Sequence, residues 1–175
     1  MFIKIYKRFI NFYYKFFKSN IAYARYKGVT IGENCFISTR NWSSEAYLIT
    51  IGNNVYITSG VWLHTHGGGS AVLDKCPNFD LFGKILIKDY AYIGTNAQIM
   101  PGVTIGKGSI IAAGSIVTKS VPDNEVWGGN PARYICSVDE YIKKNSHYNV
   151  KSYGLNYKNK KALLLSLPEN KFIKK

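Results

Sequence analysis

A six-residue repeat runs from Ile87 to Pro122 and constrains the fold more than any other feature of the chain. Written in sixes, the stretch reads IKDYAY, IGTNAQ, IMPGVT, IGKGSI, IAAGSI and VTKSVP. Every block opens with a branched aliphatic residue, and a small or β-branched residue follows four places later. A helix would spread these aliphatics over all its faces. A chain that runs straight, turns a corner and repeats would stack them in one column, which predicts a solenoid.

This repeat resembles that of the hexapeptide-repeat acyltransferases. In that family three hexapeptides make one coil of a left-handed parallel β-helix, so the resemblance implies two full coils over residues 87–122. We therefore expect an all-β solenoid, a left-handed parallel β-helix, with an N-terminal helix, a protruding loop and a C-terminal helical tail. Several activities share this fold, so the repeat alone does not establish a function.

The phase of the repeat also divides the chain. We assign residues 29–136 to the solenoid, residues 1–28 to an N-terminal amphipathic helical segment and residues 137–175 to a basic helical tail. The phase slips by two residues across 41–50, which indicates a bulged corner. The aliphatic positions then fail across residues 67–86, which we expect to leave the solenoid as a loop. A loop of this length in a compact domain is usually functional.

The net charge of +13 lies at the two ends of the chain. Residues 1–27 carry seven basic and no acidic residues, residues 28–137 carry seven of each, and residues 138–175 carry nine against three. A nucleic-acid reader would be expected to hold its basic stripe on the folded face, so we do not expect nucleic-acid binding. Basic ends suit an anionic membrane surface or an acidic glycan.

The N-terminal segment is aromatic and basic, and its apolar run is too interrupted for a signal peptide core or a membrane span. As a helix it places apolar residues broadly on one side and basic residues towards the other. The apolar residues are Ile3, Phe9, Ile10, Tyr13 and Phe17, and the basic ones are Lys4, Arg8, Lys15 and Lys18. Such a helix could cap the end of the solenoid or bind a membrane at its surface, and the two roles are not exclusive.

Cysteine usage favours a cytoplasmic protein, and the basic ends suggest peripheral contact with the inner face of the membrane. Cys35, Cys76 and Cys136 are odd in number and lack ligand-like spacing, so they predict neither a disulfide framework nor a metal site. A zinc enzyme on this fold would need three histidines around the metal, whereas only His64 and His66 lie within the repeat.

His64 and His66 flank Thr65 immediately before the loop. Residues two apart in a strand face the same way, so the two imidazoles should project together. The family's sugar and polysaccharide O-acetyltransferases carry Thr-His followed by an acid or proline before the loop. Thr65-His66 is similar to this signature, which implies that His66 is the general base. Imidazole titrates near neutral pH and suits that task.

One departure from the family signature concerns the residue after the histidine, which is Gly67. Another residue must then orient the imidazole. The resemblance implies Asp80 for this role, with Asp74 as the second candidate, although either acid could be a solvated loop charge. Asn41 is similar to an asparagine that the maltose acetyltransferase branch uses near the acceptor.

The resemblance also implies a site for acetyl-CoA. Thr95 and Ala113 fall where the family lines the pantetheine arm with backbone groups, and Thr118 and Lys119 fall near the adenosine end. Arg133 follows the closing motif Asn-Pro-Ala and is similar to a basic residue that the family places near the nucleotide; a guanidinium suits phosphate. The family assembles as a homotrimer with the coenzyme between subunits, which we expect here.

These features favour one function over three alternatives. We predict an acetyl-CoA-dependent O-acetyltransferase that transfers directly to a sugar hydroxyl, in capsular or exopolysaccharide assembly. An N-acetyltransferase of an amino sugar or small amine would use the same fold. A zinc enzyme lacks its third histidine. A structural or binding solenoid, such as an ice-binding array, would need a regular rank of threonines, whereas the outward positions are mixed.

Overall fold

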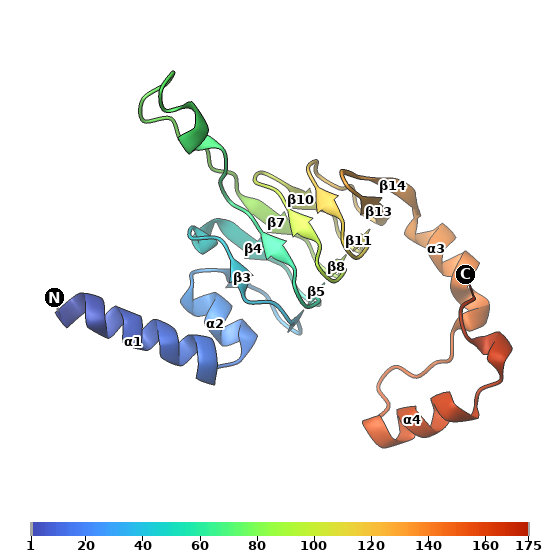
Figure 1. The fold of residues 1–175 in the computed structure, drawn as a ribbon. Coiled ribbons are helices and arrows are strands. Elements are labelled where there is room, and N and C mark those ends of the chain that lie inside the picture. The colour runs from blue at the N-terminus through green and yellow to red at the C-terminus, as the bar shows by residue number, and fades with distance from the viewer. Residues whose placement is uncertain (1, 175) are drawn as a thin grey trace. The chain divides into compact units, whose positions relative to one another are not determined.

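The computed structural model describes residues 2–174 and divides into two units, one up to Val138 and one from Asp139 onward. The first unit holds three sheets whose strands belong to successive coils (Figure 1). Sheet A contains β1 (Thr30–Ile31), β4 (Ile49–Ile51), β7 (Ile85–Ile87) and β10 (Thr104–Ile105). Sheet B contains β2 (Phe36–Ile37), β5 (Tyr56–Ile57), β8 (Tyr92–Ile93), β11 (Ile110–Ile111), β13 (Glu125–Gly129) and β14 (Ala132–Ser137). Sheet C contains β3 (Asn41–Trp42), β6 (Trp62–Leu63), β9 (Gln98–Ile99) and β12 (Ile116–Val117).

From β1 to β12 the chain visits the sheets in the order A, B, C and then starts again, so each coil adds one parallel strand to every sheet. The last two strands both join sheet B, where β14 pairs antiparallel with β13. Ile87 pairs with Ile105, Ile93 with Ile111 and Ile99 with Val117, and each pair is three hexapeptides apart. The strand order and register therefore fit the predicted parallel β-helix.

A column of aliphatic side chains fills the interior of the coils. The residues that open the six hexapeptides are fully buried, and so are the small residues at most of the following inward positions. The first set is Ile87, Ile93, Ile99, Ile105, Ile111 and Val117, and the second includes Ala91, Ala97, Ser109 and Ser115. The inward positions predicted from the repeat are confirmed.

The corners between sheets bring successive coils into very close contact. A Cβ atom added to Gly94 would lie 2.5 Å from the backbone nitrogen of Ala113 in the next coil. Real Cβ atoms do not approach that closely, so only glycine fits this corner.

Two helices precede the first coil: α1 (Phe2–Phe17) and α2 (Asn20–Tyr26). Tyr23 and Ala24 of α2 are buried in the core, and the Arg25 guanidinium donates to the carbonyl oxygen of Ile31 at 2.9 Å. The helix that covers the open end of the core is therefore α2. The predicted N-terminal helix is present as α1, although the side chains of Ile3 and Lys4 lie outside the described part.

The second unit is helical, as expected for the tail. It contains α3 (Val138–Asn145), which begins at the last residue of the first unit, and α4 (Tyr157–Ser166). Short 3₁₀ turns lie at Ser146–Tyr148 and Glu169–Lys171. The Asn156 side chain caps α4 by accepting a hydrogen bond from the backbone N–H of Asn159 at 2.9 Å.

We predict that Ile93→Ala lowers the free energy of unfolding by about 2–5 kcal/mol, because Ile93 is fully buried and truncation leaves a cavity. Leu86 lies on an outward position of β7 and is 38% exposed, so Leu86→Ala should cost at most about 1 kcal/mol. Denaturant titration followed by circular dichroism measures both. Equal losses in the two variants would contradict the described core.

Candidate active site

The irregular segments of the solenoid share one corner, the one between sheets C and A. In the first coil, residues 43–48 connect β3 to β4 and include a 3₁₀ turn at Ala46–Leu48. In the second coil, residues 64–84 connect β6 to β7 and form the loop that projects from the solenoid (Figure 1). Because β3 pairs with β6 and β4 with β7, the two insertions lie one above the other.

The loop begins and ends at a narrow neck. The backbone N–H of Gly83 donates to the carbonyl oxygen of Thr65 at 2.8 Å, and His66 and Phe82 form an antiparallel bridge. Ile85 is already buried and paired with Ile49, so the solenoid resumes two residues before the predicted return at Ile87.

Stacking of these two insertions places a carboxylate on the predicted base. The Nδ1 atom of His66 lies 2.6 Å from Oε2 of Glu45. A carboxylate can only accept at neutral pH, so Nδ1 of the neutral imidazole carries the hydrogen and Nε2 keeps a free lone pair. The His66 side chain is 43% exposed and that of Glu45 only 19%. The arrangement leaves a proton acceptor at the surface and its orienting group beneath it.

Other polar groups hold Glu45 in place. The hydroxyl of Thr65, which is fully buried, donates to Glu45 Oε2 at 3.0 Å. Ser43 accepts a hydrogen bond from the Thr65 backbone N–H at 3.1 Å. The pKa of the Glu45 carboxyl lies below its ordinary value, mainly because the Ser44 side chain donates to it, with His66 and Thr65 adding to the effect. Glu45 is therefore ionised at neutral pH.

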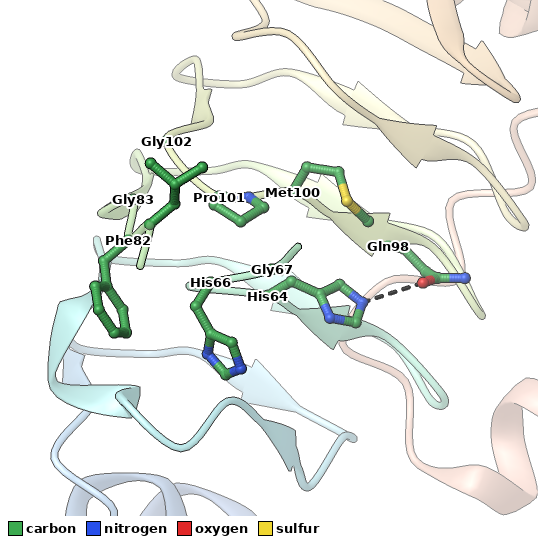
Figure 2. A pocket seen from close by; sticks show the side chains of 10 residues that line it. His64, His66, Gly67, Phe82, Gly83, Gln98, Met100, Pro101 and Gly102 are labelled. Carbon is green, nitrogen blue, oxygen red and sulfur yellow. Dashed lines mark hydrogen bonds between the residues drawn. The ribbon is translucent and has the colours of Figure 1, made fainter. Parts of the chain in front are cut away.

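The alternation of side chains around Thr65 agrees with the sequence analysis. Leu63 and Thr65 are buried, whereas His64 and His66 face outward. The two imidazoles nevertheless take different directions, as Figure 2 shows. Nε2 of His64 lies 3.1 Å from Oε1 of Gln98 in the following coil, and the ring stacks on Trp62. His64 is thus held by its neighbours, whereas His66 keeps Nε2 free.

Two cavities of about 500 Å³ each meet at His66. The first runs along the solenoid corner above the neck of the loop (Figure 2), and the second opens towards the loop itself. Residues lining the first are His64, His66, Gly67, Leu81, Phe82, Gly83, Gln98, Met100, Pro101 and Gly102. Residues lining the second are His66, Gly67, Gly68, Gly69, Ser70, Leu73, Phe79 and Asp80. A group bound in either cavity would reach the same imidazole.

Asp80 does not occupy the position that the sequence analysis gave it. Its Oδ1 accepts a hydrogen bond from the backbone N–H of Leu81 at 2.9 Å, and the carboxylate on His66 Nδ1 is that of Glu45. Asp80 lines the second cavity instead. The signal that could have found Glu45 was the two-residue slip of the repeat, since counting hexapeptides places that slip on the same corner as the loop.

The predicted coenzyme residues divide between two corners of the solenoid. Thr118 and Lys119 follow β12, so they lie on the same corner between sheets C and A as His66. Thr95 and Ala113 lie between sheets B and C, where the backbone N–H of Gly114 donates to the carbonyl oxygen of Thr95 at 2.8 Å. Sheet C separates the two groups.

Arg133 lies in sheet B and Asn41 in sheet C, in coils at opposite ends of the solenoid. Arg133 is exposed on β14, just after the turn that follows β13, and its Nη1 donates to the carbonyl oxygen of Ala132. Asn41 pairs with Trp62 in sheet C, yet it is not among the residues that line the two cavities at His66. Between residues 2 and 174, no three His, Cys, Asp or Glu side chains gather as a metal site.

Comparison with known proteins gives the class of the chain. Residues 84–119 match the family described as bacterial transferase hexapeptide, six repeats. The chain is 44% identical over 168 residues to Protein CapG of Staphylococcus aureus, covering 90% of this chain and 96% of that protein. It is 36% identical over 126 residues to the galactoside O-acetyltransferase of Escherichia coli, covering 71% of this chain and 60% of the relative.

A solved structure agrees with this result. The hexapeptide-repeat acetyltransferase of Vibrio cholerae in complex with acetyl coenzyme A superposes with a TM-score of 0.57 at 33% identity, covering 63% of this chain and 61% of that one. The chain belongs to the bacterial hexapeptide-repeat transferase family. Within that family it is an acyltransferase.

The depressed pKa of Glu45 gives a prediction for stability. A carboxyl whose pKa is lowered by folding stabilises the folded state above its unfolded-state value, and this contribution is lost as the pH falls through the folded pKa. The ordinary pKa of a glutamate is 4.5. As the pH falls below this value, the wild-type protein should therefore lose unfolding free energy relative to the Glu45→Gln variant, which has no carboxyl to protonate at this position. Denaturant titrations from pH 7 to pH 3 measure this. A difference that does not change with pH would contradict the described contacts of Glu45.

Proposed function

We propose that the protein is an acetyl-CoA-dependent O-acetyltransferase that acts on a sugar hydroxyl, built on a left-handed β-helix and used in capsular or exopolysaccharide assembly. One observation carries the proposal: His66 meets two cavities while Glu45 holds its Nδ1. Relatives that share this fold include an acetyltransferase in complex with acetyl coenzyme A and a galactoside O-acetyltransferase.

The reaction follows from the tautomer that Glu45 selects. Nε2 of His66 takes the proton of the acceptor hydroxyl as that oxygen attacks the thioester carbonyl carbon of acetyl-CoA. The tetrahedral intermediate then collapses, the C–S bond breaks, and the imidazolium returns the proton to the leaving sulfur. Ionised Glu45 stabilises the imidazolium between the two steps, at a distance of 2.6 Å from Nδ1. An ester and free coenzyme A are the products.

Direct transfer agrees with the lining of the first cavity. That cavity contains His64 and His66 but no serine or cysteine, and among the described contacts Ser70 of the second cavity makes no hydrogen bond to His66. An acyl-enzyme route would need such a nucleophile beside the base. The acetyl group therefore passes straight from sulfur to the acceptor oxygen.

The acceptor belongs in the second cavity, which the loop builds. Asp80 and Ser70 provide a carboxylate and a hydroxyl that can bind sugar hydroxyls, and Phe79 offers an aromatic surface. This gives Asp80 a role in binding the acceptor in place of the orienting role that Glu45 fills. The thioester then approaches along the first cavity, past Met100 and Gly102.

The division of the coenzyme residues supports a homotrimer. Thr118 and Lys119 lie on the corner of His66, whereas Thr95 and Ala113 lie on the corner beyond sheet C. One extended coenzyme arm that touches both groups would have to run between two copies, with the catalytic corner of one copy facing the other corner of its neighbour. In this arrangement Arg133 of the second copy contributes a cation for the phosphates.

Release of free thiol from acetyl-CoA, measured against a panel of sugars and glycan fragments, tests the proposal. His66→Ala should lower turnover by about a hundred- to ten-thousandfold, the effect of losing a general base. His64→Ala serves as the matched variant, and it should keep most of the activity because Nε2 of His64 is engaged by Gln98.

Two outcomes would contradict this mechanism. Full activity in His66→Ala with a large loss in His64→Ala would move the base to the other imidazole. A product that resists mild alkaline hydrolysis would be an amide, and the protein would then be an N-acetyltransferase.

A further inference from the structure

Helix α1 carries an apolar strip that no other described residue of the first unit covers. Residues spaced by three or four fall on one side of a helix. Ile5, Phe9, Phe12 and Phe16 follow this spacing and are between 53% and 68% exposed. The Phe12 and Phe16 rings lie 4.7 Å apart between centroids, so the strip is continuous at its C-terminal end. Large exposed apolar strips on otherwise soluble chains mark interaction surfaces.

Packing within the N-terminal segment explains the other side of α1 but not this strip. Tyr14 lies on the opposite side of the helix, where its ring stacks on Tyr26 of α2 with centroids 4.3 Å apart. The end of the core is already covered by Tyr23 and Ala24 of α2. A capping role therefore accounts for α2 and for the Tyr14 side of α1, while the Phe-rich strip remains without an occupant.

The charges beside the strip indicate what kind of surface fits it. Arg8 and Lys15 are exposed on α1 beside the strip, and the Lys15 ammonium lies 5.7 Å from the centre of the Phe16 ring. Lys18 follows the helix directly and is also exposed. Residues 1–27 contain seven basic and no acidic residues. A second copy would bring two such segments into mutual repulsion, which disfavours a self-association through α1. An anionic lipid bilayer has an apolar interior and negatively charged headgroups, so it matches both the strip and the cations.

We propose that α1 binds flat in the headgroup region of an anionic bilayer, with the Ile5–Phe16 strip inserted and the basic residues beside it at the phosphates. Within residues 2–174 no helix is long and apolar enough to span a membrane. The attachment is therefore peripheral. It would hold the enzyme at a membrane surface and does not depend on which acceptor is acetylated.

Co-sedimentation of the full chain with vesicles tests this attachment. Vesicles of phosphatidylcholine with phosphatidylglycerol should bind the protein, vesicles of phosphatidylcholine alone should bind it more weakly, and added salt should reduce the difference. Phe9→Gln/Phe16→Gln should weaken binding at least about tenfold, because two aromatic rings leave the apolar layer. Tyr153→Gln/Tyr157→Gln removes two exposed rings from the tail and should leave binding unchanged.

Two double variants, each lacking two positive charges, distinguish a contact made by α1 from a general attraction of a basic protein to anionic vesicles. Arg8→Gln/Lys15→Gln should weaken binding to the anionic vesicles more than Lys143→Gln/Lys144→Gln, which removes the same charge from α3. Thiol release from acetyl-CoA shows that each variant is folded.

Failure of the wild type to bind anionic vesicles, or equal binding by the Phe9→Gln/Phe16→Gln variant, would overturn the proposal. A change of oligomeric state in that variant, with vesicle binding intact, would assign the strip to a second copy.

Discussion

Hydrogen bonding between successive coils is the constraint on which the site depends. Each inner strand pairs with the strand one coil below and one coil above, so the corners between them have a fixed height in the stack. Because the coils cannot slide past each other, an insertion at a corner is held directly above or below its neighbours. The Glu45 insertion and the His66 loop occupy the same corner in adjacent coils, and this brings their side chains together. The Glu45–His66 pair, which we propose is catalytic, is thus fixed by backbone register.

Regular parts of the fold could be predicted because periodicity determines them. A residue that opens a hexapeptide must face inward, as Ile93 and Ile111 do, whatever the residues between them. The same counting extends to corners, and it puts Thr95 and Thr118 on different ones. The resemblance implied the pantetheine arm for Thr95 and the adenosine end for Thr118, and the structure shows that a solenoid sheet lies between these two positions.

The orienting carboxylate could not be found in the same way. Glu45 lies in a segment whose length departs from the repeat, and its backbone leaves the period through a 3₁₀ turn. Periodicity says where such a segment starts and ends but not where its side chains point. The family resemblance implied Asp80, yet in the structure its carboxylate accepts from the backbone of its own turn.

Function in this chain is concentrated where the repeat is broken. The regular coils supply the frame, and the proposed chemistry of the acyltransferase lies in two insertions on one of its corners. Attachment to a surface would come from a helix outside the frame, α1, so that catalysis and location can be altered separately. Thr65 links the frame to the site, since it is buried in the core and its hydroxyl donates to the Glu45 carboxylate, while Ser43 accepts from its backbone N–H.

A double-mutant cycle on kcat tests the central claim most directly, namely that Glu45 acts through the His66 imidazole. The account predicts that Glu45→Gln lowers kcat in the wild-type background and has no further effect in the His66→Ala background, because the group it orients is already gone. If Glu45→Gln lowers kcat by the same factor in both backgrounds, or in neither, then the two residues work independently and the proposed pair does not exist.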